Sequence, residues 1–415
     1  MGTSSSFKSI VLFLCWPFLA FVIAIKNFNS TYSKNIIWIF CIYFGISFSI
    51  STQSQRSDIT RYLAGFENLK LEDKEISSIT NMLYVPDGYN DAYYILVSYF
   101  AAKMQFPAEL YLGLIGLVFG FFYSRIFKVF ANGIGSRYDL FNLLLFLTFL
   151  MIVPIWRGIN GIRFSLAAVM FVYSVLSIYN GKIKAVYIVI LLLTPIVHFS
   201  MLSIVLLSVF FVLIRNLLNI NILFVGYIFS LLFVQVDLEQ LNVVLNNYAP
   251  ELFSSKIDAY ARTSYIGEIE QRVSNNNWYA LWYFKALNYA AVILMLLIFK
   301  YYNRLININP KVKPFLFFLF FISIFSNISS LVPSGSRMSL ISIMLTLYFF
   351  SEMYQDGSTN LQRSFIRYFI APLLIFYNLI QLRIGAEFIS LETLVGNPFI
   401  SLLGFEKYSV MDIFR

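Results

Sequence analysis

Two arginines flank a glycine-containing turn between two apolar segments, in the sequence WRGINGIR at residues 156–163. The guanidinium groups of Arg157 and Arg163 can each bind phosphate through two parallel hydrogen bonds, and glycine lets a backbone approach a ligand closely. Asn160 lies between them and adds an amide. Because the flanking segments are apolar, both charges are expected at a membrane surface or just inside it, where an anionic partner offsets their cost. The alternative is that both side chains only extend to the lipid headgroups.

Further polar residues lie at the ends of other apolar segments. His198 is the only histidine, and it could take a proton from a hydroxyl group when neutral or bind phosphate when charged. Arg337 directly precedes a late apolar segment. Asp58 and Arg61 are separated by one helical turn. The corresponding alternatives are a histidine bonded to a carbonyl, an arginine reaching the headgroups, and a surface ion pair that contributes little.

Residues 237–278 mix charged and aromatic side chains. Arg262 and Arg272 lie in this stretch, and Trp278 stands at its end. Aromatic rings beside charged and amide groups suit stacking on a sugar, so these residues are candidates for binding an acceptor glycan. Many loops at a membrane surface have a similar composition.

The composition indicates an integral membrane protein. Of the 415 residues, 59% are hydrophobic and 12% are charged, whereas soluble domains carry about 25% charged residues. The net charge of +9 is scattered over many loops, which favours contact with anionic lipids over nucleic acid. Cys15 and Cys41 both fall in apolar segments and indicate no disulfide framework. One histidine and no acid-rich motif argue against a metal site.

The apolar segments predict an all-α polytopic protein that forms a single membrane domain over residues 1–415. Strand-period alternation is absent, and helices satisfy their own backbone hydrogen bonds in lipid. The stretch Ala92–Met104 is too short to cross alone and is expected to be an interfacial or re-entrant helix. Twelve spans of about 16–22 residues are predicted, near residues 9–25, 36–51, 108–131, 139–155, 162–179, 183–197, 199–214, 217–236, 279–299, 315–333, 337–352 and 366–382.

The short loops set the expected orientation, because Lys and Arg accumulate on the cytoplasmic side. The short loops on one face hold only Arg157, Arg163 and Arg337. That face is therefore predicted to be outside, together with the two long loops at residues 52–91 and 237–278. If Ala92–Met104 crosses the membrane, the first two spans invert. The short loops on the opposite face hold Lys26, Lys34, Arg125, Lys128, Arg137, Lys182, Lys184, Arg215, Lys300, Arg304, Lys311, Lys313, Arg363 and Arg367.

Several motifs resemble the EpsG/Wzy-like family of bacterial polysaccharide polymerases. The sequence DITRY at 58–62 follows the second span, GIRFSLA at 161–167 opens a helix, and HFS occupies 198–200. Arg337 before a late span adds to the likeness, which covers most of the chain by order and spacing. Phe164 follows the helix-opening arginine, where family members often carry a polar residue.

The resemblance implies a membrane glycosyltransferase related in general design to the GT-C class. Such enzymes join O-antigen, capsule or exopolysaccharide repeat units carried on undecaprenyl diphosphate at the outer face of the bacterial cytoplasmic membrane. They need no nucleotide cofactor or metal, and a chain-length regulator is a partner implied only by the family. On this interpretation Arg157, Arg163, Arg337 and Arg61 bind the diphosphate, and His198, Arg163 and Asp58 serve catalysis. Arg262, Arg272, Trp278 and Asn160 would bind the acceptor glycan.

Other functions use similar residues. A flippase or exporter of the same lipid-linked unit also needs cations for the diphosphate, but in a cavity reachable from both sides of the membrane. An O-antigen-type ligase shares the donor and differs in its acceptor. An acyltransferase usually takes its acyl donor from the cytoplasm, whereas the single histidine is predicted to face outward.

Overall fold

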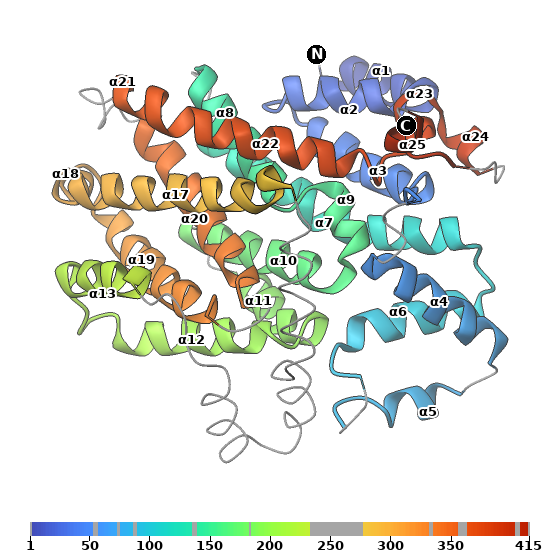
Figure 1. The fold of residues 1–415 in the computed structure, drawn as a ribbon, viewed down its shortest axis with the longest axis horizontal. Coiled ribbons are helices and arrows are strands. Elements are labelled where there is room, and N and C mark those ends of the chain that lie inside the picture. The colour runs from blue at the N-terminus through green and yellow to red at the C-terminus, as the bar shows by residue number, and fades with distance from the viewer. Residues whose placement is uncertain are drawn as a thin grey trace.

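The computed structural model describes most of the chain, with gaps in the longer polar segments. Helices dominate the part that it describes, where the only strand-like pairings are two isolated bridges, Leu83–Tyr89 and Ser390–Ser409 (Figure 1). The prediction of an all-α protein is therefore confirmed for this part. The described ranges are 2–52, 57–72, 75–85, 89–134, 139–181, 184–232, 277–331, 335–355, 363–402 and 407–413.

The described elements are helices and short helical turns. In chain order they are α1 (Gly2–Cys15), α2 (Pro17–Lys26), α3 (Ser33–Ile46), α4 (Asp58–Leu71), α5 (Ile76–Thr80), α6 (Ala92–Lys103), α7 (Ala108–Ile134), α8 (Leu140–Ile152), α9 (Ile155–Asn160), α10 (Ile162–Tyr179), α11 (Ala185–Val197), α12 (Met201–Ile214), α13 (Ile220–Leu232), α17 (Trp278–Lys300), α18 (Tyr302–Ile308), the 3₁₀ turn η1 (Pro310–Val312), α19 (Lys313–Ser329), α20 (Arg337–Gln355), α21 (Arg363–Phe365), the π-helical turn η3 (Ile366–Ile370), α22 (Ala371–Gly385), α23 (Leu391–Val395), α24 (Pro398–Ser401) and α25 (Val410–Ile413).

Five helical segments in the described ranges are long and apolar enough to cross a membrane. They are Ala108–Ile134, Leu140–Asn160, Ile162–Tyr179, Trp278–Lys300 and Ile366–Gly385. Six further predicted spans fall on apolar helices of 10–17 residues, and the span at 337–352 falls on α20. The length and composition of these helices support a membrane protein, while the number of twelve spans stays a prediction.

The structure changes two details of the predicted organisation and does not describe a third. The first predicted span, 9–25, is broken at Trp16, because Pro17 begins a new helix and has no N–H to continue the preceding one. The predicted loop 52–91 contains the helices α4 and α5. The second predicted loop, 237–278, lies outside the described residues except for its last two positions.

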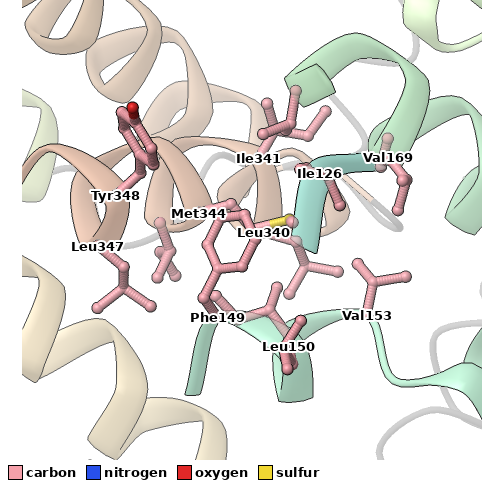
Figure 2. Close-up of a cluster of buried hydrophobic side chains, with 14 of the residues drawn as sticks. Ile126, Phe149, Leu150, Val153, Val169, Leu340, Ile341, Met344, Leu347 and Tyr348 are labelled. Atoms are coloured by element: carbon pink, nitrogen blue, oxygen red, sulfur yellow. The ribbon is translucent and has the colours of Figure 1, made fainter. Parts of the chain in front are cut away.

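Tight packing between α3 and α7 forms one side of the bundle. A Cβ atom at Gly45 would collide with the backbone of Leu112, and one at Gly116 with the backbone of Cys41. Small residues at such crossings let helix backbones approach closely, as is typical of packing within membranes. In the core beside this pair, side chains from α7, α8, α10 and α20 converge, among them Ile126 and Phe149 (Figure 2).

The helices α4, α5 and α6 gather on one flank of the bundle (Figure 1). There α6 packs against α4, α10 and α11, while α4 also contacts the short helix α9. Polar segments that are distant in sequence are thereby brought beside the turn between α9 and α10. This turn is the one that carries Arg157 and Arg163.

Candidate functional site

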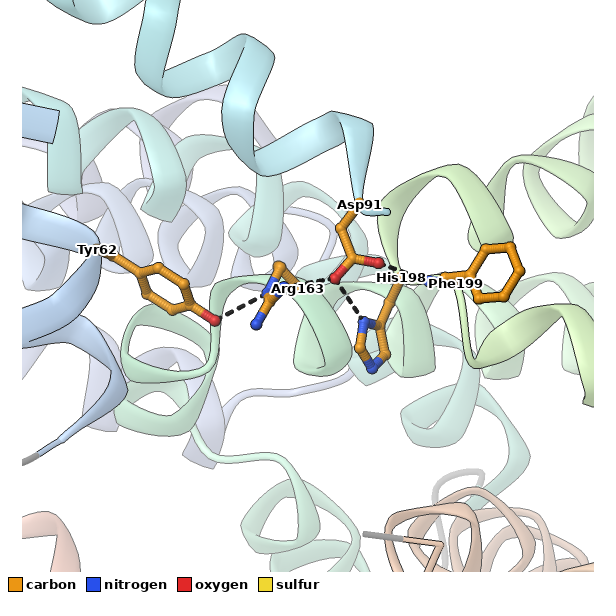
Figure 3. A network of polar contacts seen from close by, with 5 residues as sticks. All are labelled: Tyr62, Asp91, Arg163, His198 and Phe199. Carbon is orange, nitrogen blue, oxygen red and sulfur yellow. Dashed lines mark hydrogen bonds and ion pairs between the residues drawn. The ribbon is translucent and has the colours of Figure 1, made fainter. Parts of the chain in front are cut away.

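A buried aspartate connects three separate segments beside this turn. Asp91 Oδ2 accepts a hydrogen bond from Arg163 Nη1 at 2.7 Å and lies 3.1 Å from His198 Nδ1, while its Oδ1 accepts from the Phe199 backbone N–H at 2.7 Å (Figure 3). Arg163 Nε donates in turn to the Tyr62 hydroxyl at 2.8 Å. The set Tyr62, Asp91, Arg163, His198 and Phe199 is called the Asp91 network below.

The helix ends explain why these side chains meet. Asp91 is the residue before α6, Arg163 is the second residue of α10, and His198 is the residue directly after α11. All three residues lie at helix ends, and α6 packs against both α10 and α11. This packing brings the three helix ends together and sets the distances between their side chains. The α4 residue Tyr62 completes the set and lies against Tyr94 of α6, with the rings tilted by 47° and their centroids 4.6 Å apart.

The charges of the Asp91 network are balanced within it. The Asp91 side chain is only 6% exposed, and burial alone would raise its pKa. The hydrogen bond and charge of His198, the charge of Arg163 and the Phe199 N–H outweigh burial and lower the pKa of Asp91. In the neutral imidazole, a proton on His198 Nδ1 directed at Asp91 leaves Nε2 as an acceptor, whereas in the charged form both nitrogens donate. Asp91 therefore orients the imidazole and fixes one arm of the guanidinium.

A second group of predicted residues lines a pocket of about 420 Å³ next to this network. Its charged and amide-bearing lining residues are Asp58, Arg157, Asn160 and Arg337, which come from α4, α9 and the start of α20. This pocket is called the arginine pocket below. Its wall also includes the aromatic rings of Trp156, Phe164, Tyr283 and Phe284.

The two guanidinium groups of the arginine pocket have no carboxylate partner among the described residues. Arg157 donates to the Ile152 carbonyl at 3.1 Å and lies over the Trp156 ring. Asp58 is paired with Arg61 through its Oδ1. Asn160 accepts the Ile59 N–H at 3.1 Å through its side-chain oxygen. The pocket therefore holds two positive groups whose charge a bound anion would balance.

The remaining predicted site residues lie outside the arginine pocket. The Arg61 side chain is 78% exposed, and Trp278 is exposed and stacks on Phe376. Arg163 and His198 belong to the Asp91 network, and the ring of Phe164, which lines the pocket, meets the His198 ring edge-on at 5.6 Å. Two predicted glycan-binding residues, Arg262 and Arg272, fall outside the described residues.

Sequence reasoning did not identify Asp91. Its partners are 72 and 107 residues away along the chain, so no local spacing reveals the contact. The available signal was an aspartate placed directly before an apolar helix, a position where acidic residues often cap the helix. Here the carboxylate instead bonds to groups of α10 and of the turn between α11 and α12.

The arrangement can bind an anion and orient a base, and the described residues contain no group of three or more His, Cys, Asp or Glu placed to hold a metal. Comparison with protein-family models, with curated proteins and with solved structures gave no match.

Proposed function

We propose that this protein is a polysaccharide polymerase, a membrane glycosyltransferase that joins oligosaccharide repeat units carried on undecaprenyl diphosphate. The observation that carries the proposal is the arginine pocket, where Arg157 and Arg337 face a common cavity without a carboxylate partner among the described residues. A lipid diphosphate places its negative charge at the level of the membrane surface. Helix-end arginines beside apolar spans suit that position.

The chemistry needs charge stabilisation on one side and a base on the other. As the bond between the sugar and the diphosphate breaks, negative charge builds on the leaving diphosphate, and preorganised guanidinium groups stabilise it. The acceptor hydroxyl attacks the anomeric carbon and gives up its proton. Asp58 is the carboxylate that lines the same pocket, so it is the candidate base in this proposal.

His198 and Asp91 have a positioning role in the same proposal. They hold Arg163 at the start of α10, and the α10 residue Phe164 separates His198 from the arginine pocket. Arg163 Nη2 has no partner among the described residues, which leaves one arm of the guanidinium for the substrate. On this view the network sets the position of a third cation beside the two in the pocket.

The test is glycan length in a deletion host that makes the matching lipid-linked repeat unit. The wild-type gene should restore a ladder of multiple repeats, and Arg157→Ala or Arg337→Ala should reduce it to a single repeat. Arg215→Ala, an exposed arginine at the end of α12, is the matched control and should keep the ladder. A full ladder from both pocket variants would contradict the proposal.

The alternatives give different results in the same host. If the protein is a flippase or exporter, lipid-linked units should accumulate on the cytoplasmic side of the membrane in the deletion strain. If the protein is a ligase, the deletion strain should still make the polymer but should not attach it to its final acceptor. The proposed orientation is tested separately by Arg61→Cys, which a membrane-impermeant thiol reagent should modify from outside the cell.

A further inference from the structure

A second cavity, of about 220 Å³, adjoins the arginine pocket inside the helix bundle. It lies among α13, α17, α19 and α20, and Phe284 and Ser336 belong to the walls of both cavities. Thr346 marks its deeper end, nine residues along α20 from Arg337. At a rise of about 1.5 Å per residue, that depth is about 14 Å, close to half of a hydrocarbon core of about 30 Å.

The wall of this cavity is polar but uncharged. Its lining residues include no Asp, Glu, Lys, Arg or His. The ring-bearing residues Tyr227 and Phe284 supply apolar surface beside the hydrogen-bonding groups. The polar groups are two asparagine amides and several hydroxyl groups, from Asn288 and Asn327 and from Ser230, Ser323, Ser330, Ser336, Ser339, Ser342 and Thr346.

Ser323 is the residue that points to a ligand. Helical serines and threonines usually donate to a carbonyl one turn earlier, as Ser342 and Thr346 do in this wall. Ser323 is only 5% exposed, yet its hydroxyl has no hydrogen-bond partner among the described residues. The hydroxyl is not among the polar atoms enclosed by protein without a partner, so it is open to the cavity. Its position in the cavity wall therefore favours an occupant that supplies one.

Asn288 adds a second unsatisfied group on the opposite helix. Its amide, on α17, has no hydrogen-bond partner in the described ranges, and it lines the same cavity as Ser323 of α19. Asn327 also lines the cavity and donates its side-chain N–H to Ser230 at 2.8 Å, so its amide oxygen is still available as an acceptor. Donors and acceptors therefore surround the space without any formal charge.

We infer that this cavity binds an uncharged sugar residue, the one attached directly to the diphosphate held in the arginine pocket. The inference rests on the proposed function, because that sugar is covalently fixed next to the diphosphate and the two cavities share Phe284 and Ser336. A neutral sugar satisfies amides and hydroxyls and stacks on rings. A uronic acid would bury a charge with no counter-charge in the wall, which is strongly unfavourable.

The alternative occupant is water alone. At about 30 Å³ per molecule, the cavity has room for about seven waters. Water would satisfy the hydrogen-bonding groups of Ser323 and Asn288 equally well. The two occupants differ in one measurable way, because only a bound sugar would block the access of small reagents to the cavity.

The test uses a thiol placed in the wall of the full-length protein in detergent. In a Cys15→Ser background, which removes the exposed native thiol, Ser323→Cys is nearly isosteric and Asn288→Cys probes the opposite wall. A small neutral methanethiosulfonate should modify both. Repeat-unit oligosaccharide released from its lipid carrier should slow that modification at least five-fold. Ser203→Cys, on the exposed face of α12, is the matched control and should react at the same rate with or without the sugar.

The results separate this inference from the proposed function. If saturating oligosaccharide leaves the rates at 323 and 288 unchanged, or if neither thiol reacts at all, the sugar site is refuted even where the glycan ladder still depends on Arg157 and Arg337. If the ladder is independent of both arginines, the polymerase proposal fails, and protection at 323 and 288 would then show a sugar site that serves another reaction.

Discussion

Replacing Asp91 with alanine should destabilise the protein as well as disturb the site. The substitution removes the acceptor shared by Arg163, His198 and the Phe199 N–H. It leaves the guanidinium of Arg163 with only its hydrogen bond to Tyr62. Arg163 Nη1 and His198 Nδ1 have no other acceptor in the network, so these two groups must find water or remain unsatisfied.

The magnitude follows from burial. Removing one partner of a buried ion pair costs about 3–5 kcal/mol. The Arg163 side chain is 38% exposed, so water compensates part of the loss and the lower end, about 3 kcal/mol, is expected. With an unfolding entropy of about 2.1 cal/mol/K per residue over 415 residues, that energy corresponds to a fall in Tm of about 3 °C.

The assay is thermal unfolding in detergent, combined with a double-mutant cycle against Arg163→Ala. The coupling energy between the two positions should be about 1–2 kcal/mol. Glu67→Ala is the control, because Glu67 forms an exposed ion pair with Lys70 and should cost less than about 1 kcal/mol. Additive effects of Asp91→Ala and Arg163→Ala would refute the reasoning, since a shared hydrogen bond must appear as coupling.

Three further outcomes are expected. Arg163→Lys keeps the charge but cannot donate to Tyr62 and Asp91 with one planar group. The amount of long-chain glycan in the ladder should therefore fall at least ten-fold, and an unchanged ladder would remove Arg163 from the site. Because the pKa of Asp91 is lower in the folded chain than its ordinary value of 3.8, its stabilisation is present above that value and is lost as the pH falls through the folded-state pKa. The Tm difference between wild type and Asp91→Asn should therefore shrink as the pH falls below about 4, and a difference that is as large at about pH 3 as at about pH 5 would contradict this assignment. Gly116→Ala should lower the stability by about 1–3 kcal/mol in the same melts, because the new methyl group meets the backbone of α3, whereas Gly226→Ala meets only a flexible side-chain end and should be nearly neutral.

Local patterns predicted the helices well where the apolar run was uninterrupted. The span expected at 162–179 is α10, Ile162–Tyr179, and the helix expected at Ala92–Met104 is α6, Ala92–Lys103. The break at Trp16 was missed because hydropathy does not register that Pro17 cannot continue a hydrogen-bond ladder. The helix α4 was missed because its polar sequence gives no span-like signal, although it packs on α6 and α9.

The candidate site shows the limit of reasoning from spacing. Arg157, Asn160 and Arg337 were selected by residue type at the ends of apolar segments, and Asp58 was selected in the long loop at 52–91. The structure places all four in one pocket. Their separation from His198 could not be predicted, because it depends on how α10 turns Phe164 relative to the pocket. Contacts between distant segments are decided by packing, which single positions in a sequence do not encode.

The close approach of α3 and α7 constrains how the site can move. Helices that touch through backbone atoms, as at Gly45 and Gly116, cannot absorb a displacement by changing side-chain rotamers, so the pair must translate or rotate as one rigid body. The short helix α9 contacts both of them, and Gly158 of α9 lies against the Phe119 ring of α7. Arg157 therefore belongs to a helix that is held by two closely packed helices, whereas Arg337 begins α20 in another wall of the pocket. A change in the distance between the two cations therefore requires α9 or α20 to move relative to the α3–α7 pair.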